Sequence, residues 1–311
     1  MPDRFLVTGA LGCVGAWTVR ALVAEGVPVV AYDLGTDPHR LRLIMKPDEL
    51  KRVSFLREDI TNLAALERAL DQYQVTHIVH LAALQVPFCR EDPIRGAQVN
   101  VVGTTSVFEA VKRRRDRIRG VAYASSVAIY GPEDTGAENP RSSPSTHYGV
   151  FKQANEGTAR IYWQDDGVPS IGLRPYTIYG PGRDQGVTSG PTHAMRAAAR
   201  GEAFHVSFGG RSHFQYVADI ARIFIAASRA LRSGAGTFNI PSTPEPMSAM
   251  VDAIVAAAPA VRGKITYDEV QLPFAVDLEA DGLEQAVGPV DLTPLAEGVG
   301  ETIALFRAAE G

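Results

Sequence analysis

Three side chains in this sequence have the types and spacing needed for proton transfer. Tyr148 and Lys152 lie four residues apart in a helical pattern, so a helix would place both on one face, one turn apart. An ammonium beside a phenol lowers the phenol pKa from about 10, which would make Tyr148 usable as an acid/base near neutrality. A Tyr and a Lys at this spacing also form ordinary surface pairs. Ser126, after an apolar run at 121–124, would polarise the substrate oxygen that exchanges a proton with Tyr148, although Ser125-Ser126 also suits a simple turn.

A glycine-rich loop predicts a dinucleotide site. Residues 8–15 close the first apolar run and open a helical pattern. The glycines let the backbone turn tightly and approach a pyrophosphate, and the helix N-terminus supplies free N–H groups. A strand before and a helix after the loop distinguish this motif from an ordinary tight turn. The expected loop contacts are Gly9, Gly12, Cys13, Val14 and Gly15.

The second expected strand ends in a carboxylate that bears on the choice of cofactor. Asp33 follows Gly15 by eighteen residues and would accept hydrogen bonds from the adenosine ribose hydroxyls. A carboxylate would repel a 2′-phosphate, so the sequence favours NAD over NADP, although Arg40 and Arg42 leave NADP open. An Asp that merely begins a turn is the alternative. Asp59 and Ile60, after the third expected strand, are weaker candidates for contact with the adenine.

Alternating strand and helix patterns must position these groups. Strands are expected at 5–7, 27–32, 53–56, 77–81, 121–124 and 170–173, and helices at 14–24, 63–70, 93–115 and 144–163. Such alternation requires right-handed crossovers and a parallel sheet, which predicts an α/β, Rossmann-type doubly wound fold. Residues 1–174 would form the NAD-binding domain. Residues 175–311 would form a smaller α/β substrate lobe that exchanges segments with it, with helices at 192–200, 217–231, 247–258 and 295–308 and strands at 203–206, 237–240 and 264–267.

Composition excludes several classes of protein. The 311 residues carry 31 Lys and Arg against 35 Asp and Glu, a net charge of -4 that gives no support to wholesale nucleic-acid binding. Two cysteines cannot build a disulfide framework, and the seven histidines show no recognised metal-ligand spacing, so no metal is expected. No apolar run is long enough for a membrane helix and no signal peptide is evident, so we expect a cytoplasmic protein.

Charge is unevenly distributed along the chain. Residues 265–306 contain nine acids and no Lys or Arg, so the remainder carries 31 basic against 26 acidic residues. The basic run at 112–119 looks superficially like a nucleic-acid contact. Its place at the end of an expected helix indicates solvated cations that complement the helix dipole.

Together these motifs resemble the extended short-chain dehydrogenase/reductase family, also called the NAD-dependent epimerase/dehydratase family. The matching stretches are Gly9–Gly15, His80-Leu81-Ala82-Ala83, Asn100-Val101-Val102-Gly103-Thr104, Ser126–Gly131, Tyr148 with Lys152, Leu173–Gly182 and Thr293–Gly298. The resemblance adds Leu81, Ala82, Ala83 and Asn100 to the expected cofactor site.

The resemblance also implies a mechanism and an assembly. Tyr148 would take the proton of a secondary alcohol while hydride passes to NAD, with Ser126 holding the oxygen and Lys152 binding ribose. Reversal would reduce a carbonyl, and rotation of a keto intermediate before hydride return would give epimerisation. The family further implies a homodimer through the helices near 93–115 and 144–163.

The sequence departs from the family where substrates are distinguished. Val127 and Ala128 follow Ser126 where related dehydratases carry acids, which disfavours loss of water. Ser212 and His213 stand where nucleotide-sugar members have Arg-Asp, and Arg211 is one position early. A second diphosphate-binding arginine would come from residues 265–306, which have none, although a diphosphate requires charge-assisted donors.

We therefore expect an NAD-dependent oxidoreductase acting on a free sugar, sugar acid or polyol, with net dehydrogenation or epimerisation. Candidate substrate contacts are Ser125, Ser126, Tyr176, Arg183, His193 and Arg211. A solvated loop residue is the alternative for Arg183. A nucleotide-sugar 4-epimerase with phosphate donors from elsewhere remains open. So does a non-catalytic NAD-sensing regulator, although a sensor would not need Ser126, Tyr148 and Lys152 together.

Overall fold

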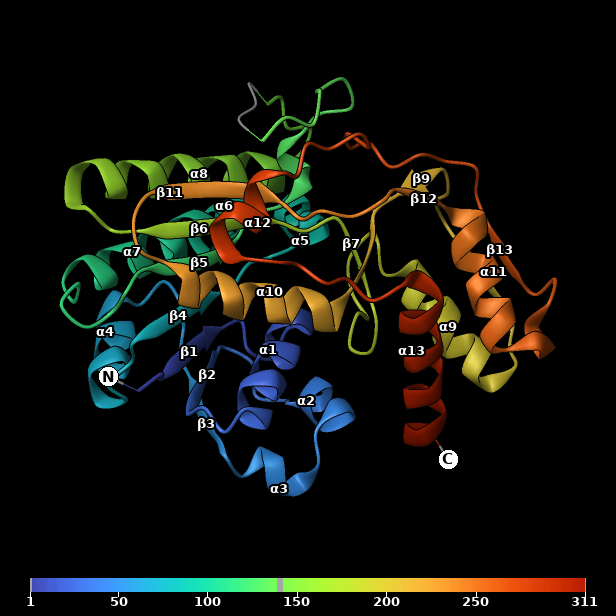
Figure 1. Cartoon of the computed structure of the whole chain (residues 1–311), viewed down its shortest axis with the longest axis horizontal. Coiled ribbons are helices and arrows are strands. Elements are labelled where there is room, and N and C mark those ends of the chain that lie inside the picture. The colour runs from blue at the N-terminus through green and yellow to red at the C-terminus, as the bar shows by residue number, and fades with distance from the viewer. Residues whose placement is uncertain (1, 139–141, 311) are drawn as a thin grey trace.

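The computed structural model describes residues 2–138 and 142–310, and its centre is a parallel seven-stranded sheet (Figure 1). The strand order is β11-β6-β5-β4-β1-β2-β3, with every neighbouring pair parallel. The strands are β1 (Phe5–Thr8), β2 (Val29–Asp33), β3 (Val53–Arg57), β4 (His77–His80), β5 (Val121–Ala124), β6 (Ser170–Arg174) and β11 (Ala235–Asn239). The expected doubly wound parallel sheet is confirmed.

Helices cover both faces of this sheet, so its central strands β1, β4 and β6 are buried along their whole length. One face is covered by α1 (Cys13–Ala24) and α10 (Val217–Ala230), which pack on each other. The other is covered by α4 (Leu63–Gln72), α7 (Gly103–Lys112) and α8 (His147–Asp166). Buried side chains accordingly form two cores, one on each side of the sheet.

The helix expected over 93–115 is interrupted. The chain forms α6 (Pro93–Ala97), a π-helical turn η1 (Gln98–Val102) and then α7. The expected helix at 144–163 begins later, at His147, because Thr146 Oγ1 accepts a hydrogen bond from Gly149 N at 3.0 Å. It ends where Gly167 takes the left-handed conformation, with φ 63°. The short helices α2 (His39–Ile44), α3 (Pro47–Leu50), α5 (Val86–Glu91) and α12 (Gly282–Val287) were not predicted, because four to six residues carry no readable helical period.

The second half of the chain contributes to both lobes. Strand β11 extends the main sheet beside β6, although it lies beyond residue 174. In Figure 1, α9 (Gly190–Arg200), α11 (Met247–Ala257) and α13 (Leu295–Glu310) gather at one end of the molecule, and they pack on one another. Paired short strands accompany them: β7 (Thr177–Tyr179) with β10 (Phe214–Tyr216), β8 (Phe204–Val206) with β13 (Ile265–Tyr267), and β9 (Arg211–Ser212) with β12 (Glu245–Pro246).

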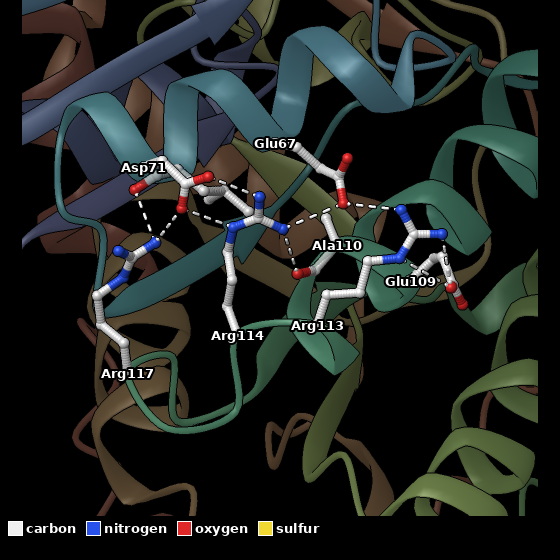
Figure 2. Close-up of polar contacts among 8 residues, drawn as sticks. Glu67, Asp71, Glu109, Ala110, Arg113, Arg114 and Arg117 are labelled. Carbon is white, nitrogen blue, oxygen red and sulfur yellow. Dashed lines mark hydrogen bonds and ion pairs between the residues drawn. The ribbon is translucent and has the colours of Figure 1, made fainter.

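The basic run after α7 is a structural clamp (Figure 2). Arg114 and Arg117 both pair with Asp71 of α4, at 2.7 and 2.8 Å, and their hydrogen bonds, aided by their charge, hold the pKa of Asp71 below its usual range. Arg113 pairs with Glu67 and Glu109, each at 3.0 Å. The expectation that these cations stay solvated is wrong for Arg114 and Arg117, whose side chains are only 15% and 14% exposed. The run ties α7 to α4, which leaves few of its charges for a nucleic acid.

The acid-rich segment, residues 265–306, has long irregular stretches between its elements and is called the strap below. It runs from β13 through α12 to α13, and Figure 1 shows it passing over the carboxyl end of the sheet. Gly136 lies against this strap, because a Cβ there would be 2.2 Å from Asp277 O. Phe274 is the strap residue that borders the large cavity described below, and none of the nine acids borders it.

Candidate active site

A cavity of about 710 Å³ opens at the carboxyl ends of the parallel strands. Loops after β1 and β4 diverge there toward opposite faces of the sheet, which is where sheets of this kind bind ligands. Most of the residues expected to form the site border the cavity: Gly9, Gly12, Cys13, Val14, Gly15, Asp33, Asp59, Ile60, Leu81, Ala82, Ala83, Ser125, Ser126, Tyr148, Lys152, Tyr176 and Arg183.

The glycine loop forms a cradle with no room for side chains. Gly9 has φ +66°, and a Cβ there would lie 2.7 Å from Ala82 N. A Cβ at Gly15 would lie 2.1 Å from Gly9 O. The N-cap of α1, Gly12, provides no side-chain hydrogen bond, so the first N–H groups of this twelve-residue helix remain available to a ligand. These features fit the pyrophosphate of NAD.

Asp33 is held in place by backbone donors. Leu11 N donates to one carboxylate oxygen at 2.9 Å and Gly35 N donates to the other at 2.8 Å. Arg40 and Arg42 are both committed elsewhere, to Asp184 and Asp37 respectively. The cations that left NADP open in the sequence are therefore ion-paired, and the carboxylate of Asp33 favours NAD.

A buried imidazole at the end of β4 joins the last residue of β1 to helix α7. His80 Nδ1 lies 2.7 Å from Thr8 Oγ1, and its Nε2 lies 2.9 Å from Thr104 Oγ1. Burial lowers the pKa of His80 to about 3, so the ring is neutral. Thr104 Oγ1 donates to Asn100 O at 2.7 Å, so it accepts from His80, and Thr8 then donates to Nδ1. Thr8 Oγ1 in turn accepts from Leu81 N at 3.1 Å, which fixes this wall of the cavity.

Asn100 does not border the cavity, although the family resemblance had implied cofactor contact. Its side chain is fully buried, and its amide clamps the backbone of Leu84: Nδ2 donates to Leu84 O at 2.9 Å and Oδ1 accepts from Leu84 N at 2.7 Å. The residue that faces the cavity is the neighbouring Val99. Asn100 therefore supports the loop that forms the wall.

The three proton-transfer candidates converge. Helix α8 brings Tyr148 and Lys152 to the cavity, and the loop after β5 brings Ser126. Lys152 is 3% exposed, and its ammonium donates to Ala124 O at 2.7 Å. Its Nζ lies 5.5 Å from the centre of the Tyr148 ring. The amide of Ala128 donates to Ser126 Oγ at 3.1 Å, which orients the hydroxyl.

The expected lowering of the Tyr148 pKa is not found in this ligand-free arrangement. Burial raises the pKa of Tyr148, and a hydrogen bond with Ser126 and the charge of Arg183 only partly oppose the rise. Burial also lowers the pKa of Lys152 to about 8, because removing an ammonium from water disfavours its charged form. The ammonium is directed at a carbonyl on strand β5 instead of at the phenol.

Sequence reasoning missed a buried ion pair directly behind the catalytic candidates. Arg174, 2% exposed, forms two hydrogen bonds to Glu156, at 2.8 and 2.9 Å, and a third to Tyr130 OH at 2.9 Å. Glu156 also accepts a hydrogen bond from Ser125. Glu156 lies one helical turn after Lys152, so the i, i+4 spacing was the available signal.

The candidate substrate residues separate into two groups. Tyr176 and Arg183 border the cavity. His193 does not, since its ring stacks on Phe204 with centroids 5.9 Å apart. Arg211 does not either, since it is exposed and lies 3.5 Å from Asp277. Gln85, Thr188 and Phe274 border the cavity and were not predicted.

Two absences concern only the residues that the structure describes. Within 2–138 and 142–310, no three side chains that could ligate a metal ion come together. Nor does any helix in those ranges combine the length and apolarity that crossing a membrane requires.

The sheet order, the glycine cradle and the Tyr–Lys pair define an NAD-binding α/β enzyme of the extended short-chain dehydrogenase/reductase type. The sequence model of the NAD dependent epimerase/dehydratase family matches residues 5–240. The chain belongs to this family.

Individual relatives agree with this assignment. A UDP-glucose 4-epimerase of Mycolicibacterium smegmatis is 28% identical over 317 residues, 98% of each chain. A Thermus thermophilus UDP-glucose 4-epimerase solved with NAD has a TM-score of 0.78 and 26% identity over 98% of this chain and 99% of that one. An L-threonine dehydrogenase of Clostridium difficile shares the fold, with a TM-score of 0.84 at 19% identity, covering 99% and 98% of the two chains.

Proposed function

We propose that the protein oxidises a secondary alcohol on a sugar-like molecule, with dehydrogenation or epimerisation as the net result. The observation that carries the proposal is the meeting of Ser126, Tyr148 and Lys152 in the cavity that also contains the glycine cradle and Asp33. NAD, when bound, accepts the hydride of the alcohol carbon and can return it in an epimerisation.

The roles of the side chains follow from their positions. Burial raises the pKa of Tyr148 in the ligand-free protein, so the proposal requires Tyr148 to become phenolate in the complex with NAD and substrate. There it takes the hydroxyl proton, and Ser126 donates a hydrogen bond to the same substrate oxygen. The O–H and C–H bonds break together and a carbonyl forms. Lys152 stabilises the phenolate by its charge and binds the nicotinamide ribose. The proposed cofactor contacts are Gly9, Gly12, Cys13, Val14, Gly15, Asp33, Asp59, Ile60, Leu81, Ala82, Ala83 and Lys152, with Asn100 acting through Leu84.

Residues 211–213, which would bind the diphosphate of a nucleotide sugar, are not placed to do so. This supports a substrate that has no nucleotide diphosphate. Ser212 is fully buried and bonds Thr177 at 2.7 Å. His213 bonds Ser242 and Val276 O, and burial lowers its pKa. Arg211 lies outside the cavity. A free sugar, sugar acid or polyol therefore suits the site better.

A nucleotide-sugar 4-epimerase is the second candidate. It is favoured by the Mycolicibacterium smegmatis relative, a UDP-glucose 4-epimerase that matches along 98% of both chains. Its phosphate donors would have to come from positions other than 211–213.

We also propose a homodimer in the cytoplasm. Apolar side chains stand exposed on α6, η1 and α8, the helices that would face a second copy: Ile94, Val102, Val150 and Ile161. On α8, Gly157 lies on the same side as Val150 and Ile161, and a Cβ there would meet nothing within 4 Å. Sedimentation of Ile161→Glu against wild type tests the dimer, which should dissociate.

Both cysteines are free thiols, which suits a reducing compartment such as the cytoplasm.

One experiment tests the reaction. Purified protein is incubated with NAD and with free sugars, sugar acids, polyols and nucleotide sugars, while NADH absorbance and product stereochemistry are followed. NADH accumulation with a free sugar or sugar acid supports dehydrogenation, and inversion without net NADH supports epimerisation. Tyr148→Phe should lower turnover about 10²- to 10⁴-fold while NAD still binds. Turnover at the wild-type rate in that variant would refute the mechanism. NAD binding by the wild-type protein without turnover of any compound would favour a non-catalytic NAD-sensing regulator.

A further inference from the structure

The cavity is bordered by a guanidinium that has no carboxylate partner among the described residues. Among the described residues that border the cavity, Arg40 pairs with Asp184 and Arg95 pairs with Asp59. Arg183 forms no ion pair there. Its Nη2 donates to Thr188 Oγ1 at 2.9 Å, and its Nε is buried without any hydrogen-bond partner.

A second unpartnered polar atom lies beside this guanidinium. Gln85 Oε1 is also buried without a partner. The two side chains meet at Gly186, where a Cβ would be 2.2 Å from Gln85 Oε1 and 3.1 Å from Arg183 Nη2. Gly186 has φ +95°, so glycine is suited both to the backbone and to the space. Buried polar atoms in native proteins are ordinarily hydrogen-bonded, so two unpartnered atoms in side chains that border one cavity indicate a site completed by a ligand.

The pair lies close to the reacting groups. Gln85, Arg183 and Thr188 border the same cavity as Ser126 and Tyr148. The positive charge of Arg183 acts on the Tyr148 hydroxyl, since it partly opposes the rise of that pKa. A ligand group held by Arg183 would therefore sit on the same small molecule as the alcohol that Tyr148 deprotonates.

We propose that Arg183 and Gln85 form a subsite for a hydroxy acid: the guanidinium binds the substrate carboxylate, and Gln85 Oε1 accepts a hydrogen bond from a neighbouring hydroxyl. Arginine suits this role because its fixed fork matches the geometry of a carboxylate. The inference rests on the proposed function and narrows its substrate class to sugar acids and related hydroxy acids.

The cofactor pyrophosphate is the competing anion for this guanidinium. Arg183 also lies near the glycine loop, where its charge acts against the burial that raises the pKa of Cys13 to about 12. The two assignments predict different defects in an Arg183 variant. Loss of a carboxylate contact would weaken the binding of the acid alone, whereas loss of a pyrophosphate contact would weaken the binding of NAD.

The test compares acids with their neutral counterparts. D-galacturonate is paired with D-galactose, D-gluconate with D-glucitol, and UDP-glucuronate with UDP-glucose, so that the arms separate free acids from nucleotide-linked ones. The wild-type protein should have a higher kcat/KM for the acid than for its neutral counterpart in at least one pair. Arg183→Gln should raise KM for that acid about 100-fold relative to KM for the neutral partner, while any change in kcat that passes through the Tyr148 pKa should be the same for both. Arg183→Lys should recover part of the loss, and the exposed Arg262→Gln should match wild type.

Binding measurements keep the subsite distinguishable from the reaction. The NAD Kd of Arg183→Gln should stay within about twofold of wild type, because a side chain that does not touch the cofactor changes its affinity little. A rise in that Kd equal to the rise in KM would overturn the subsite, as would equal use of acids and neutral sugars by wild type. Quenching of bound NADH fluorescence reports acid binding without turnover. Arg183-dependent binding with no turnover would retain the subsite and reject the proposed reaction, and turnover of neutral sugars without acid binding would do the reverse.

Discussion

Arg40 and Asp184, 144 residues apart in the sequence, form an ion pair at 2.6 Å across the cofactor end of the cavity. Arg40 also donates to Leu11 O of the glycine loop at 2.8 Å and to Gly182 O at 3.1 Å. One guanidinium thus links the loop that cradles the cofactor to the loop that carries Arg183. Burial raises the pKa of Asp184, but the hydrogen bond and charge of Arg40 outweigh it, so this pKa lies below its usual value.

We predict that this ion pair supports NAD binding. Arg40→Gln and Asp184→Asn should each raise the Kd for NAD about tenfold, since each removes a charge-assisted bond worth about 1.4 kcal/mol or more. A double-mutant cycle on the Kd should give coupling, because the two side chains act on one contact. Lys51→Gln, which breaks an exposed pair with Asp48, is the control and should bind NAD normally. Additive effects of the two variants would contradict a shared contact.

The buried lysine should reduce stability at neutral pH. The pKa of Lys152 is about 8 in the fold against an ordinary 10.5, which corresponds to about 3 kcal/mol of destabilisation where both states are protonated. This penalty is complete below pH 8 and disappears as the pH rises toward 10.5, because the native state releases its proton first. Lys152→Met removes the buried charge but also the hydrogen bond to Ala124 O. We therefore expect the free energy of unfolding to rise by about 1 to 2 kcal/mol at pH 7.

Urea unfolding at pH 7 and near pH 10 measures this effect. The advantage of Lys152→Met should shrink or reverse at the higher pH, while its turnover stays low at both. A constant advantage at both values would show that charge burial is not its cause. Such a trade between stability and activity is expected where a site needs a charge in a dry environment.

The Glu156–Arg174 pair should be the most costly contact to break near the site. Glu156→Ala leaves the guanidinium of Arg174 buried and unpaired, so we expect a loss of about 3 to 5 kcal/mol in denaturant unfolding. Glu156→Gln keeps hydrogen-bonding atoms and should cost less. The control is Glu109→Ala, which breaks the more exposed pair with Arg113 and should cost about 1 kcal/mol or less.

A catalytic readout separates positioning from stability. Because Glu156 accepts the bond from Ser125, next to Ser126, Glu156→Gln should lower kcat more than it raises KM. An unchanged kcat in a stably folded Glu156→Gln variant would leave the pair a purely structural role.

Local spacing determined much of this protein. The glycine loop, Asp33 at the end of its strand, and the Tyr148–Lys152 pair were readable because strand ends and i, i+4 positions fix neighbours within a few residues. The parallel sheet followed from the alternation of strands and helices. These features predicted the NAD-dependent family before any tertiary contact was known.

Tertiary structure decided which of the remaining polar residues belong to the site. His193 and Arg211 have suitable side chains, but their elements point them elsewhere, and Asn100 supports a wall it does not face. Gln85 meets Arg183 only because loops about a hundred residues apart return to one edge of the sheet. Sequence spacing does not encode such long-range contacts, since they depend on how the two lobes pack. The sequence alone therefore determined the cofactor and the family, and only the packing of the lobes decided which groups face the substrate.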